Sequence, residues 1–314
     1  MHPLVYHSGQ LEVQSEANTR HVADRLAGWV GPVGEYATEA DLVLLVRSEA
    51  GPGGNALRFT ALAGDRPLLT ISGESRLGVV DELRARLGGL EDGESVGGLA
   101  ISFARAARAR VHGCVRRTDS ALEIEVEEAF TLCRKYIAPS EQSRLGRSAG
   151  PAASEPLSPE DPWASAVLDS AETAFLASIS PDGAPDIAHR GGPAGFLRYD
   201  PAGRRLAWTE FVGDGVFKSA GNVRATGTVA VLVPDLSSGD ALEIQGHATY
   251  ANTLTRFKPR VDPLVRLPEP FPAQGQMEVA VDSITRLRAL MHPRRPLEIG
   301  RVTSRDSPDE QAPR

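Results

Sequence analysis

The chain has 314 residues, of which 41% are hydrophobic and 24% are charged, and it carries a net charge of −7. This composition is typical of a soluble protein with a hydrophobic core, and the acidity argues against nucleic acid as the main partner. No apolar run approaches the ~20 residues that span a bilayer, so we expect no membrane partner. The first ten residues lack the basic-then-apolar pattern of a secretion signal, which favours a cytoplasmic location.

The first part of the chain opens with an amphipathic stretch. Apolar residues recur at helical spacing over 12–29, which predicts an amphipathic helix that packs through one apolar face. Short strand-like segments follow, and a further helix is expected over 79–87. Cys114 and Cys133 have no CxxC or zinc-type spacing, so we interpret both as small apolar groups and expect no metal site.

A segment rich in Ser, Pro, Ala and Gly divides the chain. It covers residues 139–157 and has no apolar periodicity, which is typical of a linker. Ser158 is then the expected N-cap of a helix over 163–171. The domains predicted from this pattern are an N-terminal one with a leading helix (1–138), a C-terminal one (158–302) and a polar tail (303–314).

The two halves repeat the same order of strands. Residues 96–101 match 229–233, and 109–113 match 242–246 at the same offset of 133. Downstream, 122–126 match 277–281, and upstream 68–72 match 205–209. Four matches in order predict a tandem duplication. The first copy has no counterpart of the Gly-rich bend in the second, so we expect the second copy to bind a ligand and the first to act as a scaffold.

The segment that starts the second copy contains the strongest functional signal. Phe175–Ser180 predicts a strand, Pro181–Gly183 a turn, and Pro185–Ala188 a second strand that leads into His189, Arg190 and the bend Gly191–Gly195. A cation next to residues without bulky side chains lets backbone N–H groups approach an anion. The hairpin therefore predicts a phosphate site on antiparallel strands, and neither a Rossmann nor a P-loop motif is present.

These residues resemble a family. The string His189-Arg190-Gly191-Gly192-Pro193, the pair Gly195-Phe196 and the later Gly221-Asn222 are similar to the FMN-binding split barrels of the pyridoxamine 5′-phosphate oxidase-like family. The resemblance extends over 158–250 and more loosely to 290, and the opening Tyr6-His7-Ser8-Gly9 and the string Cys133–Ile137 are similar to the long, two-barrel branch. Leu132 and Arg134 depart from that branch, and the Tyr- and Arg-rich substrate residues of the true oxidases have no counterpart.

The resemblance implies the fold, the cofactor and a set of site residues. The fold is expected to be mainly β with α (α+β), as two tandem split β-barrels that pack as an internal pseudo-dimer. FMN is the implied cofactor, with NADH or NADPH as electron donor. Arg190 would hold the flavin phosphate or ring, and Lys218 with Ser219 would meet the phosphate at a helix start. Two roles are considered for His189: a proton donor near the flavin, or a side chain that is packed and hydrogen-bonded within the protein. The cofactor-binding residues that we predict are His189, Arg190, Gly191, Gly192, Thr209, Phe211, Lys218, Ser219 and Asn222.

Three functions fit the sequence. The leading hypothesis is an FMN-dependent oxidoreductase that passes electrons from a reduced nicotinamide, or a similar donor, to a small acceptor, with further homodimerisation left open. The alternative is a non-catalytic protein that binds a flavin, haem or deazaflavin; a haem would need an axial ligand such as His189, His247 or His7. A structural protein with a decayed site is disfavoured, because the second copy keeps its Gly-Gly-Pro bend. The Pro-rich segment 258–276 is interpreted as either a lid or a long connection.

Overall fold

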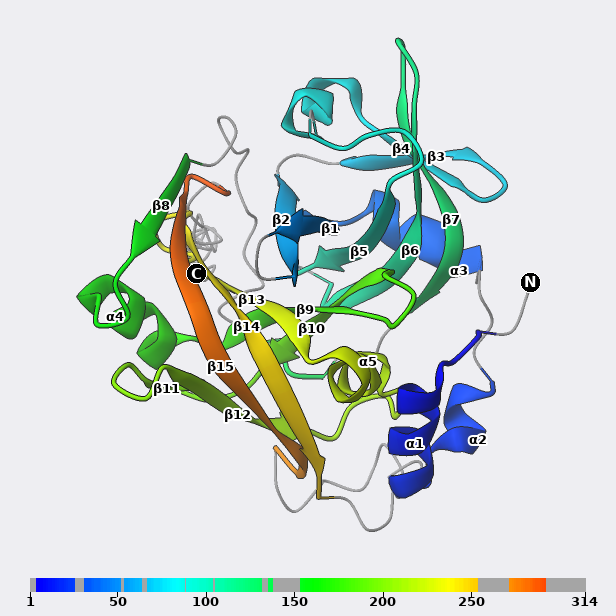
Figure 1. Cartoon of the computed structure of the whole chain (residues 1–314). Coiled ribbons are helices and arrows are strands. Elements are labelled where there is room, and N and C mark those ends of the chain that lie inside the picture. Colours follow the sequence, from blue (N-terminus) through cyan, green and yellow to red (C-terminus); the bar gives the residue numbers. More distant parts are fainter. Residues whose placement is uncertain are drawn as a thin grey trace, which may run out of the picture.

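The computed structural model describes residues 4–25, 31–51, 54–63, 67–87, 89–103, 105–131, 135–137, 153–253 and 271–291. Two antiparallel sheets make up most of this part of the chain, and short helices lie around them (Figure 1). No helix in these ranges is long and apolar enough to cross a membrane. The prediction of a mainly β, α+β fold in two tandem copies is confirmed.

The first sheet belongs to the N-terminal half. Its seven strands are ordered β2-β1-β5-β6-β7-β4-β3. The helix α3 (Gly31–Thr38) contacts β3, β5, β6 and β7, and a 3₁₀ helix, η1 (Asp81–Leu87), lies in the expected helix region 79–87. The strands of this sheet are β1 (Leu42–Gly51), β2 (Gly54–Ala63), β3 (Leu69–Gly73), β4 (Arg76–Val79), β5 (Ser95–Ser102), β6 (Ala107–Arg117) and β7 (Leu122–Thr131).

The second sheet repeats this order in the C-terminal half, as β10-β9-β13-β14-β15-β12-β11, with β8 added beside β15. The helices α4 (Pro162–Ser170) and α5 (Lys218–Thr226) accompany it. Its strands are β8 (Ala153–Leu157), β9 (Thr173–Ile179), β10 (Pro185–Gly191), β11 (Arg198–Asp200), β12 (Arg205–Phe211), β13 (Thr228–Pro234), β14 (Ala241–Asn252) and β15 (Ala273–Arg288).

The duplication extends to single residues. In β6 and β7, Gly113 pairs with Val126 next to a β-bulge, and in β14 and β15, Gly246 pairs with Val281 next to a bulge at the same position. Three of the four sequence matches therefore fall on equivalent strands. The upstream match was one strand out of place: β12 pairs with β15 as β4 pairs with β7, so 76–79, and not 68–72, are the counterpart of 205–208. Both segments have alternating patterns, which is why the sequence alone did not separate them.

Three hydrophobic clusters follow from this arrangement. One fills each barrel, and the third lies between the barrels. Strand β1 shows how the strand period builds them: Val43 and Leu45 face the core of the first barrel, whereas Leu42 and Leu44 face the second. Across the interface β10 lies against β5, and β13 lies against β2, which are equivalent contacts in the two copies. The barrels thus form an internal pseudo-dimer.

The N-terminal helix packs on the second barrel and not on its own. The stretch 12–29 was expected to form one helix. Its described part, 12–25, instead contains the end of α1 (Ser8–Glu16) and the helix α2 (Arg20–Ala23), with Asn18 at a positive φ between them, and 26–29 lie outside the described residues. Val13 and Ala17 join the core of the second barrel, and α1 lies against α5 (Figure 1). The two helices touch at Gly221, where an added Cβ would lie 2.4 Å from the Cα of Gln10.

Other boundaries differ from the sequence prediction in smaller ways. The last five residues of the predicted linker form β8, which pairs with β15, while 139–152 lie outside the described residues. Asp161, and not Ser158, caps α4 by accepting hydrogen bonds from the N–H groups of Trp163 and Ala164. Both carboxylates and hydroxyls serve at this position, so a Ser three residues earlier gave a plausible but wrong cap. The domain limits themselves stay a prediction.

Candidate functional site between the two barrels

The start of α5 lies in the space between the barrels. Its N-cap is Phe217, held at φ 54°, and among the described residues no side chain caps the helix. The first N–H groups of a helix have no partner within it, and the helix dipole places partial positive charge at this end. Lys218, Ser219 and Ala220 line a cavity here of about 90 Å³. Such a helix start is a suitable anion site.

Arginine side chains from both barrels line the same cavity, which we call the arginine cavity. Four cations, Arg108, Arg110, Arg190 and Lys218, line it together with two carboxylates, Glu210 and Asp214. Arg108 and Arg110 come from β6 of the first barrel, the copy that was expected to act as a scaffold. Sequence reasoning missed both arginines, since the only signal was a strand with alternating Arg and apolar residues that looked like an exposed face.

Arg110 is the least satisfied of these cations. Only 6% of the residue is exposed, and its Nε–H has no hydrogen-bond partner among the residues described. Its other nitrogens make long contacts, at 3.4 Å to the carboxylate of Asp186 and 3.4 Å to the hydroxyl of Ser219. Ser219 in turn donates to Asp186 over 3.2 Å. A buried guanidinium with an unused donor requires an explanation, and a bound anion supplies one.

His189 is enclosed by protein groups. Arg108 donates to its Nδ1, which must therefore be the acceptor, so Nε2 carries the proton and donates to the hydroxyl of Thr173 over 2.8 Å. The ring meets Phe175 edge-on with centroids 5.7 Å apart. Burial, and then the charges of Arg108 and Arg190, hold the pKa of His189 well below its usual range. Of the two hypotheses for His189, this geometry favours the packed, hydrogen-bonded one.

The two cations that the sequence predicted at the site, Arg190 and Lys218, already have carboxylate partners. Arg190 points to the other face of β10, where its Nε donates to Glu210 over 2.6 Å, and Trp208 donates to the same oxygen over 2.7 Å. Lys218 forms an ion pair with Glu128 of the first barrel. Both pairs are largely buried. Both cations line the arginine cavity, but Arg110 retains more unused donor capacity than either.

The Gly-rich bend is explained by packing. An added Cβ on Gly191 would lie 1.9 Å from the carbonyl oxygen of Tyr136, and one on Gly192 would lie 2.7 Å from the ring of Phe196. Gly191 lines the arginine cavity, and Gly192 does not. The close approach that the two glycines allow is therefore with the first barrel and with Phe196.

Aromatic rings stand beside the cavity. Phe211 and Tyr136 line it with ring centroids 5.6 Å apart, and Phe271 lies 5.2 Å from Phe211 and 5.7 Å from Tyr136. Thr209 also lines the cavity and accepts a hydrogen bond from Gln276. Half-exposed aromatic rings of this kind offer stacking surface to a planar ligand.

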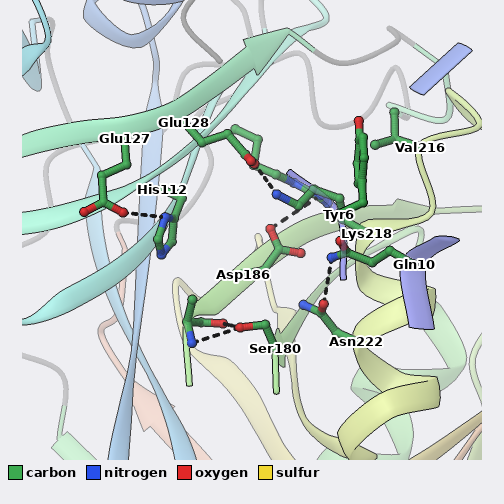
Figure 2. Close-up of polar contacts among 12 residues, drawn as sticks. Tyr6, Gln10, His112, Glu127, Glu128, Ser180, Asp186, Val216, Lys218 and Asn222 are labelled. Carbon is green, nitrogen blue, oxygen red and sulfur yellow. Dashed lines mark hydrogen bonds and ion pairs between the residues drawn. The ribbon is translucent and has the colours of Figure 1, made fainter. Parts of the chain in front are cut away.

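Asn222 faces a second, larger cavity of about 380 Å³ on the other side of Lys218. The walls come from the N-terminal segment, from β6 and β7 of the first barrel, and from the β9–β10 turn and α5 of the second (Figure 2). Its charged residues are Glu128, Asp182, Asp186 and Lys218, so we call it the carboxylate cavity. Lys218 lines both cavities. Of the predicted site residues, Asn222 lies here, while His189, Arg190, Gly191, Thr209, Phe211, Lys218 and Ser219 line the arginine cavity.

The internal symmetry explains why the two copies differ. Strand pairing makes Glu243 of β14 the counterpart of Arg110, and Arg58 of β2 the counterpart of Asp186. Both positions form an ion pair across the interface, at 3.4 Å for Arg110–Asp186 and 3.2 Å for Arg58–Glu243, but with the charges exchanged. The buried cation therefore points toward α5 only, and the equivalent position carries a buried carboxylate whose pKa is raised by burial.

The enclosed state of His189 predicts a pH effect on stability. The pKa of His189 is depressed in the folded protein. At pH values below the ordinary histidine pKa of about 6.5, the unfolded chain therefore binds a proton at this residue and the folded chain does not. We expect the free energy of unfolding to fall between pH 7.5 and 5, with a contribution from His189 that approaches ~1.4 kcal/mol per pH unit. Urea unfolding at several pH values measures this. His189→Asn keeps an acceptor for Arg108 and should show a shallower slope; an equal slope in both proteins would contradict the assignment.

The chain matches no family model, and no curated protein matches it. Part of the chain is similar to solved structures of the pyridoxamine 5′-phosphate oxidase-like group. A putative pyridoxamine 5′-phosphate oxidase from Lactobacillus delbrueckii is 18% identical over 36% of this chain and 83% of its own, with a TM-score of 0.25.

Two further structures have comparable scores. A protein titled F420 reductase is 18% identical over 38% of this chain and 93% of its own, with a TM-score of 0.26. A pyridoxamine 5′-phosphate oxidase-related, FMN-binding protein from Nostoc punctiforme is 13% identical over 43% of this chain and 88% of its own, with a TM-score of 0.29. The fold assignment rests on the strand order of the two sheets.

Proposed function

We propose that the chain binds FMN between its two barrels and acts as an FMN-dependent oxidoreductase. The observation that carries the proposal is the arginine cavity, where the buried, incompletely paired Arg110 and the uncapped start of α5 come together. A phosphate monoester would satisfy the unused donors of both.

The cavity of about 90 Å³ has room for only part of FMN, and the residues in and around it suit the chemistry of each part of the ligand. Arg110, Ser219 and the first N–H groups of α5 would hold the phosphate. Tyr136 and Phe211 would pack against the flavin ring, and Thr209 would border it. Arg190 is fixed by Glu210, so its role would be to place positive charge near the ligand and to hold β10 against β12. When bound, the flavin supplies hydride or electron transfer, and the protein supplies position and electrostatics.

A haem is the less suitable ligand for the arginine cavity, which His7, the third possible axial ligand, does not line. An axial histidine needs a free ring nitrogen, and both nitrogens of His189 are engaged, by Arg108 and Thr173. The side chain of His247 is 59% exposed and lines neither cavity. A flavin or deazaflavin held without turnover is the alternative that a test must separate from the oxidoreductase. The small-molecule substrate, a homodimer and a cytoplasmic location stay part of the proposal.

The test is the visible absorption of the purified protein, before and after incubation with FMN and removal of the excess. A retained flavin spectrum that is bleached by NADH or NADPH without oxygen supports the oxidoreductase. A retained spectrum that neither donor bleaches supports a non-catalytic flavoprotein. Without any retained flavin, the proposal fails.

A further inference from the structure

We propose that Gln14 of α1 is a positioning residue for the phosphate site, because it holds the backbone that leads into α5. The inference rests on the proposed binding of FMN and extends it to a residue that lines neither cavity. The amide nitrogen of Gln14 donates to the carbonyl oxygen of Val216 over 2.8 Å. Val216 directly precedes Phe217, the N-cap of α5, so this bond reaches the point where the proposed phosphate site begins.

The turn before α5 needs support from outside. Gly215 and Phe217 both have a positive φ, of 80° and 54°, and Val216 lies between them. A bulky residue such as Phe rarely adopts this conformation, and such strain persists only where the surrounding structure holds it. Both backbone groups of Val216 are held by side chains: its N–H donates to the carboxylate of Asp214 over 3.0 Å, and its carbonyl accepts from Gln14. Without the bond from Gln14, the turn can relax and the first N–H groups of α5 change direction.

Close packing fixes α1 against α5, and this gives Gln14 a defined place (Figure 1). An added Cβ on Gly9 would lie 2.6 Å from the carbonyl oxygen of Gly221, and one on Gly221 would lie 2.4 Å from the Cα of Gln10. In the second turn of α5, Gln10 donates to Asn222 over 2.9 Å. The opening string of the chain and the later Gly-Asn string therefore meet where the two helices cross, and Gln14 lies one helical turn beyond Gln10.

The environment of Gln14 does not favour an amide for stability alone. The residue is fully buried, and its Oε1 has no hydrogen-bond partner in the described part of the chain. The nitrogen must face Val216, since the amide oxygen would meet a second acceptor there. A buried amide with an unused oxygen costs free energy, which an apolar side chain of the same length would avoid. Such costs are typical of functional sites, so we assign the amide to its bond with Val216.

The experiment compares two variants of equal length and opposite expectation. Gln14→Met keeps the shape of the side chain and removes the donor to Val216. Gln10→Met is the matched control, because Gln10 is also buried on α1 but contacts the second turn of α5, and its replacement loses the bonds with Asn222 and with the N–H of His7. The full-length proteins are titrated with FMN and with riboflavin, with flavin fluorescence as the signal.

We expect Gln14→Met to bind FMN about tenfold more weakly and riboflavin within about twofold of the unaltered protein. Gln10→Met should keep the ratio of the two affinities, because its contacts lie away from the phosphate. A residue that only stabilises α1 would change both ligands alike, so this ratio separates a positioning role from a structural one.

A second measurement needs no flavin. The N–H of Gly221 donates to the carbonyl oxygen of Phe217 over 2.9 Å, and this bond closes the first turn of α5. In the ligand-free protein, hydrogen exchange of this amide reports the opening of that turn. We expect exchange to be severalfold faster in Gln14→Met, with a smaller increase in Gln10→Met. Exchange at the same rate in Gln14→Met and the unaltered protein overturns the inference.

The outcomes separate this inference from the proposed function. If the unaltered protein does not bind FMN, the proposed function fails, and the inference fails with it. If the unaltered protein binds FMN and Gln14→Met has the same ratio of FMN to riboflavin affinity, only the inference is overturned. An equal fall of this ratio in Gln14→Met and Gln10→Met also overturns it, since both residues would then act only by holding α1 in place.

Discussion

Replacement of Arg110 by Gln is expected to weaken FMN binding by about 30- to 150-fold, which corresponds to about 2–3 kcal/mol for a charge-assisted contact to phosphate. Arg110 is 6% exposed, its Nε–H is unused, and its place beside Ser219 puts it at the start of α5. Titration of FMN followed by the quenching of flavin fluorescence gives the dissociation constant.

Two further variants separate this effect from a loss of folding. Arg110→Lys keeps a charge for Asp186 but removes the planar set of donors, so we expect an intermediate loss of affinity. Arg116→Gln lies on the same strand, where the arginine is 46% exposed and bound to Glu125, and should bind FMN as the unaltered protein does. If Arg110→Gln and Arg116→Gln bind FMN equally well, the phosphate does not lie where we place it.

Gly246→Ala is expected to lower the free energy of unfolding by about 3 kcal/mol or to prevent folding. An added Cβ would lie 2.2 Å from the carbonyl oxygen of Ala280, inside the backbone of the partner strand at the β-bulge. Gly113 occupies the equivalent bulge of the first barrel, with the same conflict at 2.1 Å from the carbonyl of Glu125. Gly113→Ala should therefore have an effect of similar size. Urea unfolding measures both.

Gly213→Ala is the matched control for these variants. The nearest atom to its added Cβ is the carbonyl oxygen of Phe211 at 3.9 Å, which is ordinary contact. A change below about 1 kcal/mol is expected there. If Gly246→Ala is as stable as Gly213→Ala, the two bulges do not require glycine.

Much of the fold could be predicted because local sequence patterns determine it. Strand alternation, the Pro-Asp-Gly turn and the offset of 133 residues are read directly from the sequence, and each falls on the structure where expected. The upstream match was assigned to the wrong strand because apolar and polar residues alternate in both β3 and β4. Only the pairing of β4 with β7 identifies β4 as the counterpart of β12. The prediction of a single helix at the start of the chain was wrong because Asn18 adopts a positive φ between α1 and α2, and helical periodicity does not reveal this.

Only the part of the candidate site that the second barrel contributes could be predicted from the sequence. His189, Arg190 and Lys218 belong to strings that stand out in the sequence, and the structure places all three around the arginine cavity. Arg108 and Arg110 look like any half-exposed strand residues, because their role depends on the packing of the first barrel against the second. Likewise, no local signal shows that Glu210 and Glu128 neutralise Arg190 and Lys218. Contacts between residues 20 to 90 positions apart decide how much positive charge remains for a ligand.

A comparison of FMN with riboflavin tests the central claim most directly. The two ligands share the ring and the ribityl chain and differ in the phosphate, which is the group that we assign to Arg110 and the start of α5. Both are titrated into the purified protein under the same conditions, with flavin fluorescence as the signal. The account predicts that FMN binds at least about 100-fold more tightly. Equal affinity for the two ligands would show that the arginine cavity does not hold the phosphate.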